Sequence, residues 1–368
     1  MTAARLILWA FVAVLIAACS TVKTVRSPAG STPSSTQLIP ERLIPERFAD
    51  LAGWDREDHA AAFLAFRAGC PAARDPTMIA VCRNAMAIDL PGEAEARRFF
   101  EAKFQPHAVP GEGILTAYFA PEYPARSAPT AEFSASVRGR PTDLVFAGAT
   151  GRDPMRRLAD GTLVPYPDRA WIETHAVGET LAWMRPEELF FLQVQGSGVL
   201  TMADGFRVKA LFAATNGQPF RGIANPMKTR GLLTDTSGEA IRTWLAAHRG
   251  AEAEEVMRLN PRYAFFRMAP DDGLPPVGAA NLPLTGGRAI AVDTTWRGLG
   301  ELYWIDGRAP ILPGAYPTYQ RLVTALDTGG AIKGEVRADL YLGQGAPAGA
   351  EAGRVRHILR MHKLVPRL

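Results

Sequence analysis

Residues 327–342 read DTGGAIKGEVRADLYL, a glycine-rich turn that runs into an alternating segment. Successive side chains of a strand point to opposite faces of the sheet. One face of this segment is apolar and carries Val336, Ala338, Leu340 and Leu342. The other face carries Glu335, Arg337, Asp339 and Tyr341. The alternation therefore predicts a half-buried strand on which Asp339 points away from the core, toward a polar and aromatic surface.

Two further aspartates lie near this segment in strand or turn settings. Asp293 ends a short apolar run, and Asp327 opens the glycine-rich turn. Strand parity places Asp293 on one face with Ala289 and Ala291, whose small side chains indicate that another part of the chain packs close to it. A turn or capping role is the default interpretation for each aspartate alone. Their joint occurrence with Asp339 favours a shared site.

The rest of the folded chain is predicted to be mainly β. Short apolar runs alternate with Gly, Pro and Asp turns, which is typical of strands. The predicted strands cover residues 114–119, 189–194, 263–268, 289–293 and 336–342. Helical spacing predicts helices over 55–66, with Asp55 as its N-cap, and over 92–104, 239–248 and 252–259. Since 368 residues suffice for two cores, we expect two β domains with some helix.

Charge and histidine patterning exclude several classes of protein. The net charge of +4 is spread along the chain, with no long Lys/Arg block and no basic stripe interleaved with aromatic residues. Nucleic acid is therefore not an expected partner. The six histidines show no ligand spacing, so we expect no metal and no cofactor.

Three short motifs imitate known functional patterns but fail in detail. Gly-Ser-Gly at 196–198 lacks the flanking glycines of a nucleophile elbow. Asp-Thr-Gly at 327–329 matches the aspartic-protease triplet, but that chemistry needs two carboxylates and no second triplet is present. Gly-Gln-Gly at 343–345 is followed by Pro347 and by no convincing helix, so a nucleotide-binding loop is not expected.

The N-terminus has the pattern of an exported protein. Arg5 precedes an apolar run that is shorter than the roughly 20 residues a spanning helix needs, which predicts a signal peptide over residues 1–18. Leu-Ile-Ala-Ala-Cys resembles a bacterial lipobox and predicts lipidation of Cys19; a plain signal peptide with a coincidental cysteine is the alternative. Residues 19–47 are expected to form a flexible tether. Ser20 favours, by resemblance to other lipoproteins, the periplasmic side of the outer membrane.

Export also bears on the two remaining cysteines. Cys70 and Cys82 would meet an oxidising compartment, where thiols pair. We therefore expect a structural disulfide between them. Two separate buried thiols are the alternative.

Several longer stretches resemble the membrane-bound lytic murein transglycosylase A family. The resemblance runs from about residue 48 to the end of the chain, and its rarest blocks are QVQGSG at 193–198 and DTGGAIKG at 327–334. Ala117 and Phe119 stand where the family usually shows Gly and Tyr. Other matching stretches lie at 113–122, 165–169, 216–217, 260–266 and 283–293.

The resemblance implies a mainly β fold with some α-helix. A double-psi β-barrel domain with N-terminal helices would be formed by residues 48–111 and 260–368. A second β domain, residues 112–259, would be inserted between those two segments. The resemblance also implies that a groove for a glycan lies between the two domains.

The resemblance further implies an enzyme that cleaves the β-1,4 bond between N-acetylmuramic acid and N-acetylglucosamine and forms a 1,6-anhydro ring. We nominate Asp339 as the single catalytic acid and base. Supporting roles are expected for Asp293, Asp327 and Lys333. Substrate contacts are expected from Thr116, Tyr118, Gln193, Gln195, Gly196 and Ser197, although strand or turn scaffolding remains the alternative for each.

Two other functions remain open on the sequence. A non-catalytic glycan-binding lipoprotein would use the same groove without cutting. A hydrolase would need a second carboxylate facing the groove, with Asp327 or Glu335 as candidates. The expected partners are peptidoglycan glycan strands, the membrane through the lipid anchor, and complexes of cell-wall synthesis or hydrolysis enzymes. We expect the chain to be a monomer.

Overall fold

The computed structural model describes residues 42–148, 151, 153–310 and 316–367. The predicted signal peptide, Cys19 and most of the predicted tether lie outside these residues. Within the described part of the chain, every helix is too short or too polar to cross a bilayer.

Six strands of the larger sheet close into a ring of hydrogen-bonded neighbours within the described residues. Strand β17 pairs with both β14 and β3, and the order continues through β15, β13 and β16 back to β3. The members are β3 (Gly113–Ala120), β13 (Ala289–Val292), β14 (Leu302–Pro310), β15 (Thr318–Asp327), β16 (Arg337–Gln344) and β17 (Arg356–Pro366). Their inward side chains, among them Leu115, Ile290 and Leu340, are fully buried. The fold therefore contains a closed barrel, while its double-psi crossover stays a prediction.

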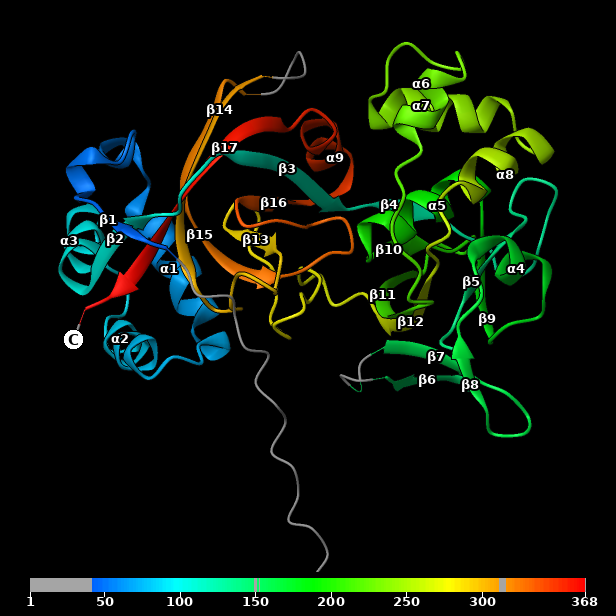
Figure 1. Ribbon diagram of the computed structural model, residues 1–368, viewed down its shortest axis with the longest axis horizontal. Coiled ribbons are helices and arrows are strands. Elements are labelled where there is room, and N and C mark those ends of the chain that lie inside the picture. The colour runs from blue at the N-terminus through cyan, green and yellow to red at the C-terminus, as the bar shows by residue number, and fades with distance from the viewer. Residues whose placement is uncertain (1–41, 149–150, 152, 311–315, 368) are drawn as a thin grey trace, which may run out of the picture. The chain divides into compact units, whose positions relative to one another are not determined.

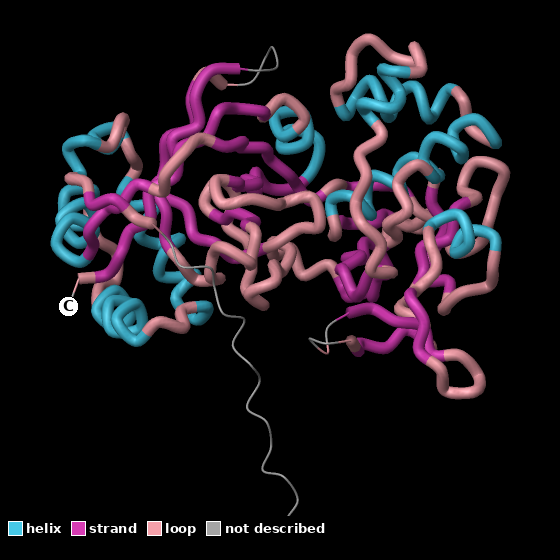
Figure 2. Tube along the Cα trace, in the orientation of Figure 1, coloured by secondary structure: helices cyan, strands magenta, loops and turns pink. Residues whose placement is uncertain are grey.

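N-terminal helices pack on the outside of this barrel (Figures 1 and 2). They are α1 (His59–Gly69), α2 (Pro76–Met86) and α3 (Glu93–Lys103), and β1 (Ile44–Pro45) and β2 (Phe104–Ala108) extend the sheet beside β17. The Phe100 ring of α3 contacts Trp54, which precedes α1, and Trp54 in turn contacts Trp304 of β14. The predicted N-cap was wrong: Asp58, not Asp55, accepts the hydrogen bond from the Ala61 N–H, so helix α1 begins at His59.

The chain contains a second sheet of four strands, which Figure 1 labels to the right of the barrel strands. Its order is β12 (Ala264–Pro270), β11 (Arg207–Thr215), β10 (Gly198–Thr201) and β4 (Glu122–Pro124). The smaller strands around it are β5 (Ala135–Arg138), β6 (Leu144–Ala147), β7 (Asp153–Arg157), β8 (Leu163–Pro165) and β9 (Thr180–Met184). The helices of this region are α4 (Arg169–Thr174), α5 (Pro186–Gln195), α6 (Ala224–Thr229), α7 (Gly238–Ala247) and α8 (Ala251–Arg258). The protein thus has the two-domain, mainly β architecture that the sequence predicts.

Two predicted local structures are wrong. The apolar run 189–194 is not a strand but part of helix α5. Pro186 at the first helical turn and Gly196 in the left-handed conformation bound a ten-residue helix, and a short buried run has no period that separates the two structures. A helix also follows the Gly-Gln-Gly motif, since Gly345–Ala352 form α9, which packs against β3.

Two strands pair across the predicted limits of the inserted domain. Strand β3 lies inside the predicted insert 112–259 but pairs with the barrel strands β16 and β17. Strand β12 lies outside the predicted insert but pairs with β11. The contacts group the described residues into one compact unit, so the domain limits themselves remain a prediction.

Cys70 and Cys82, the pair expected to be joined, form a disulfide with their Cα atoms 5.6 Å apart. The bond links the C-terminal end of α1 to α2, beside the aromatic core under the barrel. Closing a loop of this length restricts the unfolded chain and contributes about 3 kcal/mol in the chain-entropy account.

We therefore predict that replacing both cysteines by serine lowers the free energy of unfolding by about 3 kcal/mol. Urea denaturation followed by circular dichroism measures this quantity. Adding a reductant should destabilise the parent protein by a similar amount and leave the double variant unchanged. A reductant effect of equal size in both proteins would contradict the prediction.

Candidate active site

A cleft of about 570 Å³ is lined by residues from both main sheets. The barrel contributes side chains of β3 and β16 together with the turn after β15. The second domain contributes the end of α5 and parts of β11 and β12. Asp339 lies in this cleft and is half-buried, so its carboxyl group is not sealed inside the barrel.

Parallel pairing of β16 with β3 sets the surroundings of Asp339. The pairing places Asp339 opposite Thr116. The Thr116 hydroxyl donates a hydrogen bond to Asp339 Oδ1, and Arg337 Nη2 donates to Thr116 Oγ1 at 2.8 Å. The three side chains form a relay in which Arg337 polarises the hydroxyl that holds the carboxyl group.

Burial raises the pKa of the Asp339 carboxyl group above its ordinary value. The hydrogen bond from Thr116 and the positive charge of Arg337 oppose this shift, while the neighbouring charge of Asp327 adds to it. Desolvation of the carboxylate is therefore the dominant effect. A carboxyl group of raised pKa can hold a proton nearer to neutral pH and donate it to a bound molecule.

Asp327 is the second carboxyl group in the cleft. Its Oδ2 accepts a hydrogen bond from the Tyr118 hydroxyl at 2.7 Å, and its Oδ1 accepts one from the Ala279 N–H at 2.9 Å. Burial raises the pKa of Asp327 although these donors act in the opposite direction. Both oxygens thus have protein partners, which ties β15 to β3 and to the loop at Ala279.

Asp293 has a structural position outside the cleft. It is 4% exposed and accepts hydrogen bonds from the Gly334 and Thr295 N–H groups at 2.9 and 3.1 Å. Burial acts to raise the pKa of Asp293, but these N–H donors outweigh it and lower the value. Lys333 lies 3.6 Å from Asp293 with its side chain 64% exposed and does not line the cleft. Both residues therefore hold the loop before β16.

All six residues predicted to contact substrate line the cleft. Gln195 Oε1 accepts a hydrogen bond from the Phe119 N–H at 3.1 Å, and Ser197 Oγ accepts one from Phe212 at 3.3 Å. Gln193 is different: its side chain is buried, yet Oε1 has no donor among the described residues. An unsatisfied buried acceptor is costly to the fold, and the residue that carries it lines the cleft.

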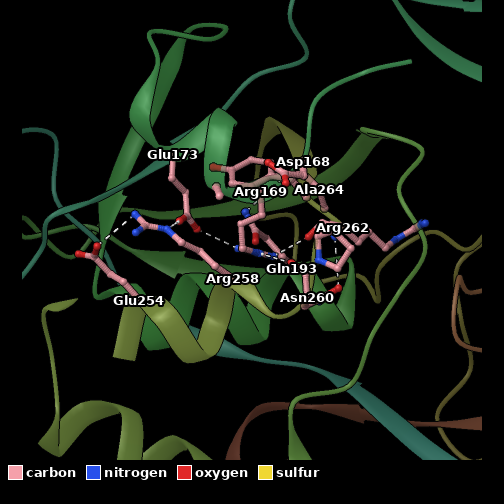
Figure 3. Close-up of polar contacts among 12 residues, drawn as sticks. Asp168, Arg169, Glu173, Gln193, Glu254, Arg258, Asn260, Arg262 and Ala264 are labelled. Atoms are coloured by element: carbon pink, nitrogen blue, oxygen red, sulfur yellow. Dashed lines mark hydrogen bonds and ion pairs between the residues drawn. The ribbon is translucent and has the colours of Figure 1, made fainter. Parts of the chain in front are cut away.

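A buried ion-pair network beside the cleft was missed by the sequence analysis (Figure 3). Arg169 is 2% exposed; it pairs with Glu173 at 3.3 Å and donates to the backbone oxygens of Asn260 and Arg262 at 3.0 and 2.7 Å. Arg258 extends the chain of contacts from Glu173. Arg169 and Glu173 have the i,i+4 spacing of helix α4. Their other partners come from α8 and from the segment before β12, so no local pattern links the whole network.

Arg337 was also missed as a site residue, although a signal for it was present. It shares a strand face with Asp339, two residues away, and the alternation that singled out Asp339 applies equally to it. Within the described residues, no group of three or more His, Cys, Asp or Glu side chains is placed to hold a metal ion.

The protein is therefore a two-domain, mainly β protein, in which a closed barrel and a second β domain line one cleft that contains the carboxyl groups of Asp327 and Asp339. The chain matches the MltA specific insert domain over residues 114–267 and the 3D domain over residues 288–365. It is 30% identical to a membrane-bound lytic murein transglycosylase from Agrobacterium tumefaciens, whose crystal structure superposes with a TM-score of 0.78 and coverage of 88% of this chain and 98% of that one. The chain belongs to the membrane-bound lytic murein transglycosylase A family.

Two further relatives are informative. Membrane-bound lytic murein transglycosylase A of Escherichia coli K12 is 35% identical over 208 residues, which are 53% of this chain and 55% of the relative. The alignment thus spans about half the length of that relative. The crystal structure of E. coli MltA with bound chitohexaose superposes with a TM-score of 0.63 at 25% identity, covering 92% of this chain and 98% of that one.

The raised pKa of Asp339 predicts a stability effect with a definite sign. Because the folded-state pKa lies above the unfolded value of about 4, stability is lost as the pH rises through the folded pKa. Asp339→Asn removes the ionisable group and should raise the Tm at pH 8 by roughly 2–4 °C. The gain should shrink toward pH 4.

Differential scanning calorimetry between pH 4 and pH 8 measures this effect. The exposed carboxylate variant Asp55→Asn is the matched control and should show no such pH-dependent gain. A Tm at pH 8 equal to or below that of the parent would contradict the assigned direction of the shift.

Proposed function

We propose that this chain is a lytic transglycosylase that cleaves the β-1,4 bond between N-acetylmuramic acid and N-acetylglucosamine in murein. The observation that carries the proposal is a carboxyl group of raised pKa, Asp339, in a cleft of saccharide size. The names of the relatives support the substrate class, and chitohexaose, a β-1,4-linked oligosaccharide, is bound in one of them.

In the first step Asp339 acts as the general acid. Its carboxyl group donates a proton to the glycosidic oxygen, which leaves as the 4-hydroxyl group of N-acetylglucosamine as the bond to C1 of the muramyl residue breaks. Burial favours the protonated form of the carboxyl group, and the hydrogen bond from Thr116 to Oδ1 orients the acid. The same hydrogen bond stabilises the carboxylate once the proton has left.

In the second step the Asp339 carboxylate acts as the base. It takes the proton of the C6 hydroxyl group of the same muramyl residue while that oxygen bonds to C1 and closes the 1,6-anhydro ring. The carboxyl group is thereby restored and no water is consumed. An intramolecular hydroxyl group reaches a very high effective concentration, so no second carboxylate has to supply or activate a nucleophile.

The cleft offers polar groups that would position the sugar rings. Gln193 lines the cleft, and its Oε1 has no hydrogen-bond donor among the described residues. Gln195, Gly196 and Ser197 continue this surface at the end of α5, and Tyr118 borders it on the barrel side. These residues would hold the chain while Asp339 acts on one bond.

A hydrolase is the second candidate function, because Asp327 places a second carboxyl group in the cleft. A hydrolase would use that group to activate water or to attack C1. Both Asp327 oxygens already accept hydrogen bonds from Tyr118 and Ala279, which favours a supporting role. Glu335, the other predicted candidate, does not line the cleft.

The cellular setting is part of the proposal. The relatives are named membrane-bound, and the lipobox at Cys19 would supply a lipid anchor on the periplasmic side of the outer membrane. A monomer at this position would act on peptidoglycan strands during wall turnover, alone or with wall-synthesis and hydrolysis enzymes.

Replacing the acid should remove the activity. We expect Asp339→Asn to lower the rate of sacculus digestion by about 10²–10⁴-fold or more, because one group serves both proton transfers. Mass spectrometry of the soluble products reads the reaction: wild type should release 1,6-anhydro-muropeptides. Reducing ends would indicate the hydrolase, and intact strands would indicate a non-catalytic glycan binder. Asp55→Asn serves as the control with normal rate.

The Thr116 hydrogen bond should be visible in the pH profile. It lowers the pKa of Asp339, so its removal in Thr116→Val raises that pKa further. The high-pH limb of kcat/KM, where the acid loses its proton, should move to higher pH. Thr116→Ser keeps the hydroxyl group and should keep the wild-type limb. A limb that moves to lower pH in the valine variant would refute the arrangement.

A further inference from the structure

Three arginines in the cleft have no carboxylate within 4.0 Å among the described residues: Arg262, Arg267 and Arg337. Arg337 is engaged by Thr116 and the backbone, and Arg267 is exposed. Arg262 is half-buried, and its guanidinium makes one long hydrogen bond, from Nη1 to the Gln218 carbonyl at 3.5 Å. A desolvated cation without a counterion is costly to the fold and marks a candidate ligand-binding group.

Hydrogen bonds hold the backbone of Arg262 behind the cleft. Its carbonyl oxygen accepts a hydrogen bond from Arg169 at 2.7 Å, and its N–H donates to Asn260 Oδ1 at 3.3 Å. Arg169 is in turn fixed by Glu173 (Figure 3). The network neutralises Arg169 and leaves the Arg262 charge uncompensated. The Arg262 backbone is therefore anchored, and its side chain lines the cleft.

The guanidinium of Arg262 also fits against a glycine of the opposite domain. A Cβ atom added to Gly330 would lie 2.8 Å from Arg262 Cζ. The backbone of Gly330 does not have a positive φ, so its conformation does not require glycine. What the glycine provides is space for the guanidinium beside the turn that precedes Asp339.

We propose that Arg262 is a specificity residue that binds a carboxylate carried by the glycan. This inference rests on the proposed function, because muramyl residues carry carboxylates that chito-oligosaccharides lack. A planar guanidinium with free N–H groups pairs with a carboxylate through two parallel hydrogen bonds. The carboxylate has two sources, the lactyl group of a peptide-free muramyl residue or the peptide stem.

Binding measurements in the Asp339→Asn background test this inference without relying on cleavage. Isothermal titration calorimetry would compare chitohexaose, peptide-free murein oligosaccharides and peptide-bearing ones, with and without Arg262→Gln. We expect the substitution to weaken binding of a carboxylate-bearing ligand by roughly 10- to 100-fold and to leave chitohexaose unchanged. Loss with the peptide-free ligand identifies the lactyl carboxylate, and loss with the peptide-bearing ligand alone identifies the stem.

Two controls separate charge recognition from damage to the fold. Arg83→Gln removes an exposed arginine of α2 that does not line the cleft and should change no affinity. Arg262→Lys keeps the charge and should retain part of the preference. An equal loss of chitohexaose affinity in Arg262→Gln, or no loss for any ligand, would overturn the inference. Failure of the proposed function would appear separately, as wild-type product without anhydro ends.

Discussion

Parallel pairing of β16 with β3 is the constraint on which the site depends. It joins residues more than two hundred positions apart and sets Asp339 beside Thr116 in one register. A shift by one residue would turn Asp339 into the barrel core and bring Ala338 to the cleft. The buried side chains Ala338 and Leu340 oppose that shift, because they belong to the core inside the barrel. The packing of apolar residues thus fixes where the acid lies.

The same pairing relates the two domains chemically. Strand β3 carries Tyr118, which donates to Asp327 at the end of β15, and its neighbour Phe119 donates through its N–H to Gln195 of α5. One strand therefore connects the acid, the second carboxyl group and the wall of the second domain. Ala117 and Phe119, which stand where the family usually shows Gly and Tyr, both lie on this strand.

Sequence alone could predict the parts of this arrangement that follow from short periods. Strand alternation identified β16 and the outward direction of Asp339, and helical spacing identified α3, α7 and α8. It failed for 189–194, because a buried run bounded by Pro186 and Gly196 satisfies strand and helix patterns equally. It also missed Arg169 and Arg262, whose roles come from contacts between distant segments. Charge balance across a cleft has no signature in a linear sequence.

The three aspartates show why a site has to be argued from surroundings and not from residue type. Asp293 receives two backbone N–H donors, and its pKa is lowered; Asp327 and Asp339 are desolvated, and their pKa values are raised. The charged form of Asp293 stabilises a loop, whereas burial disfavours the charged forms of Asp327 and Asp339. Asp339 and the Arg262 cation, whose charges the fold compensates only in part, both line the cleft, where a glycan would supply further partners.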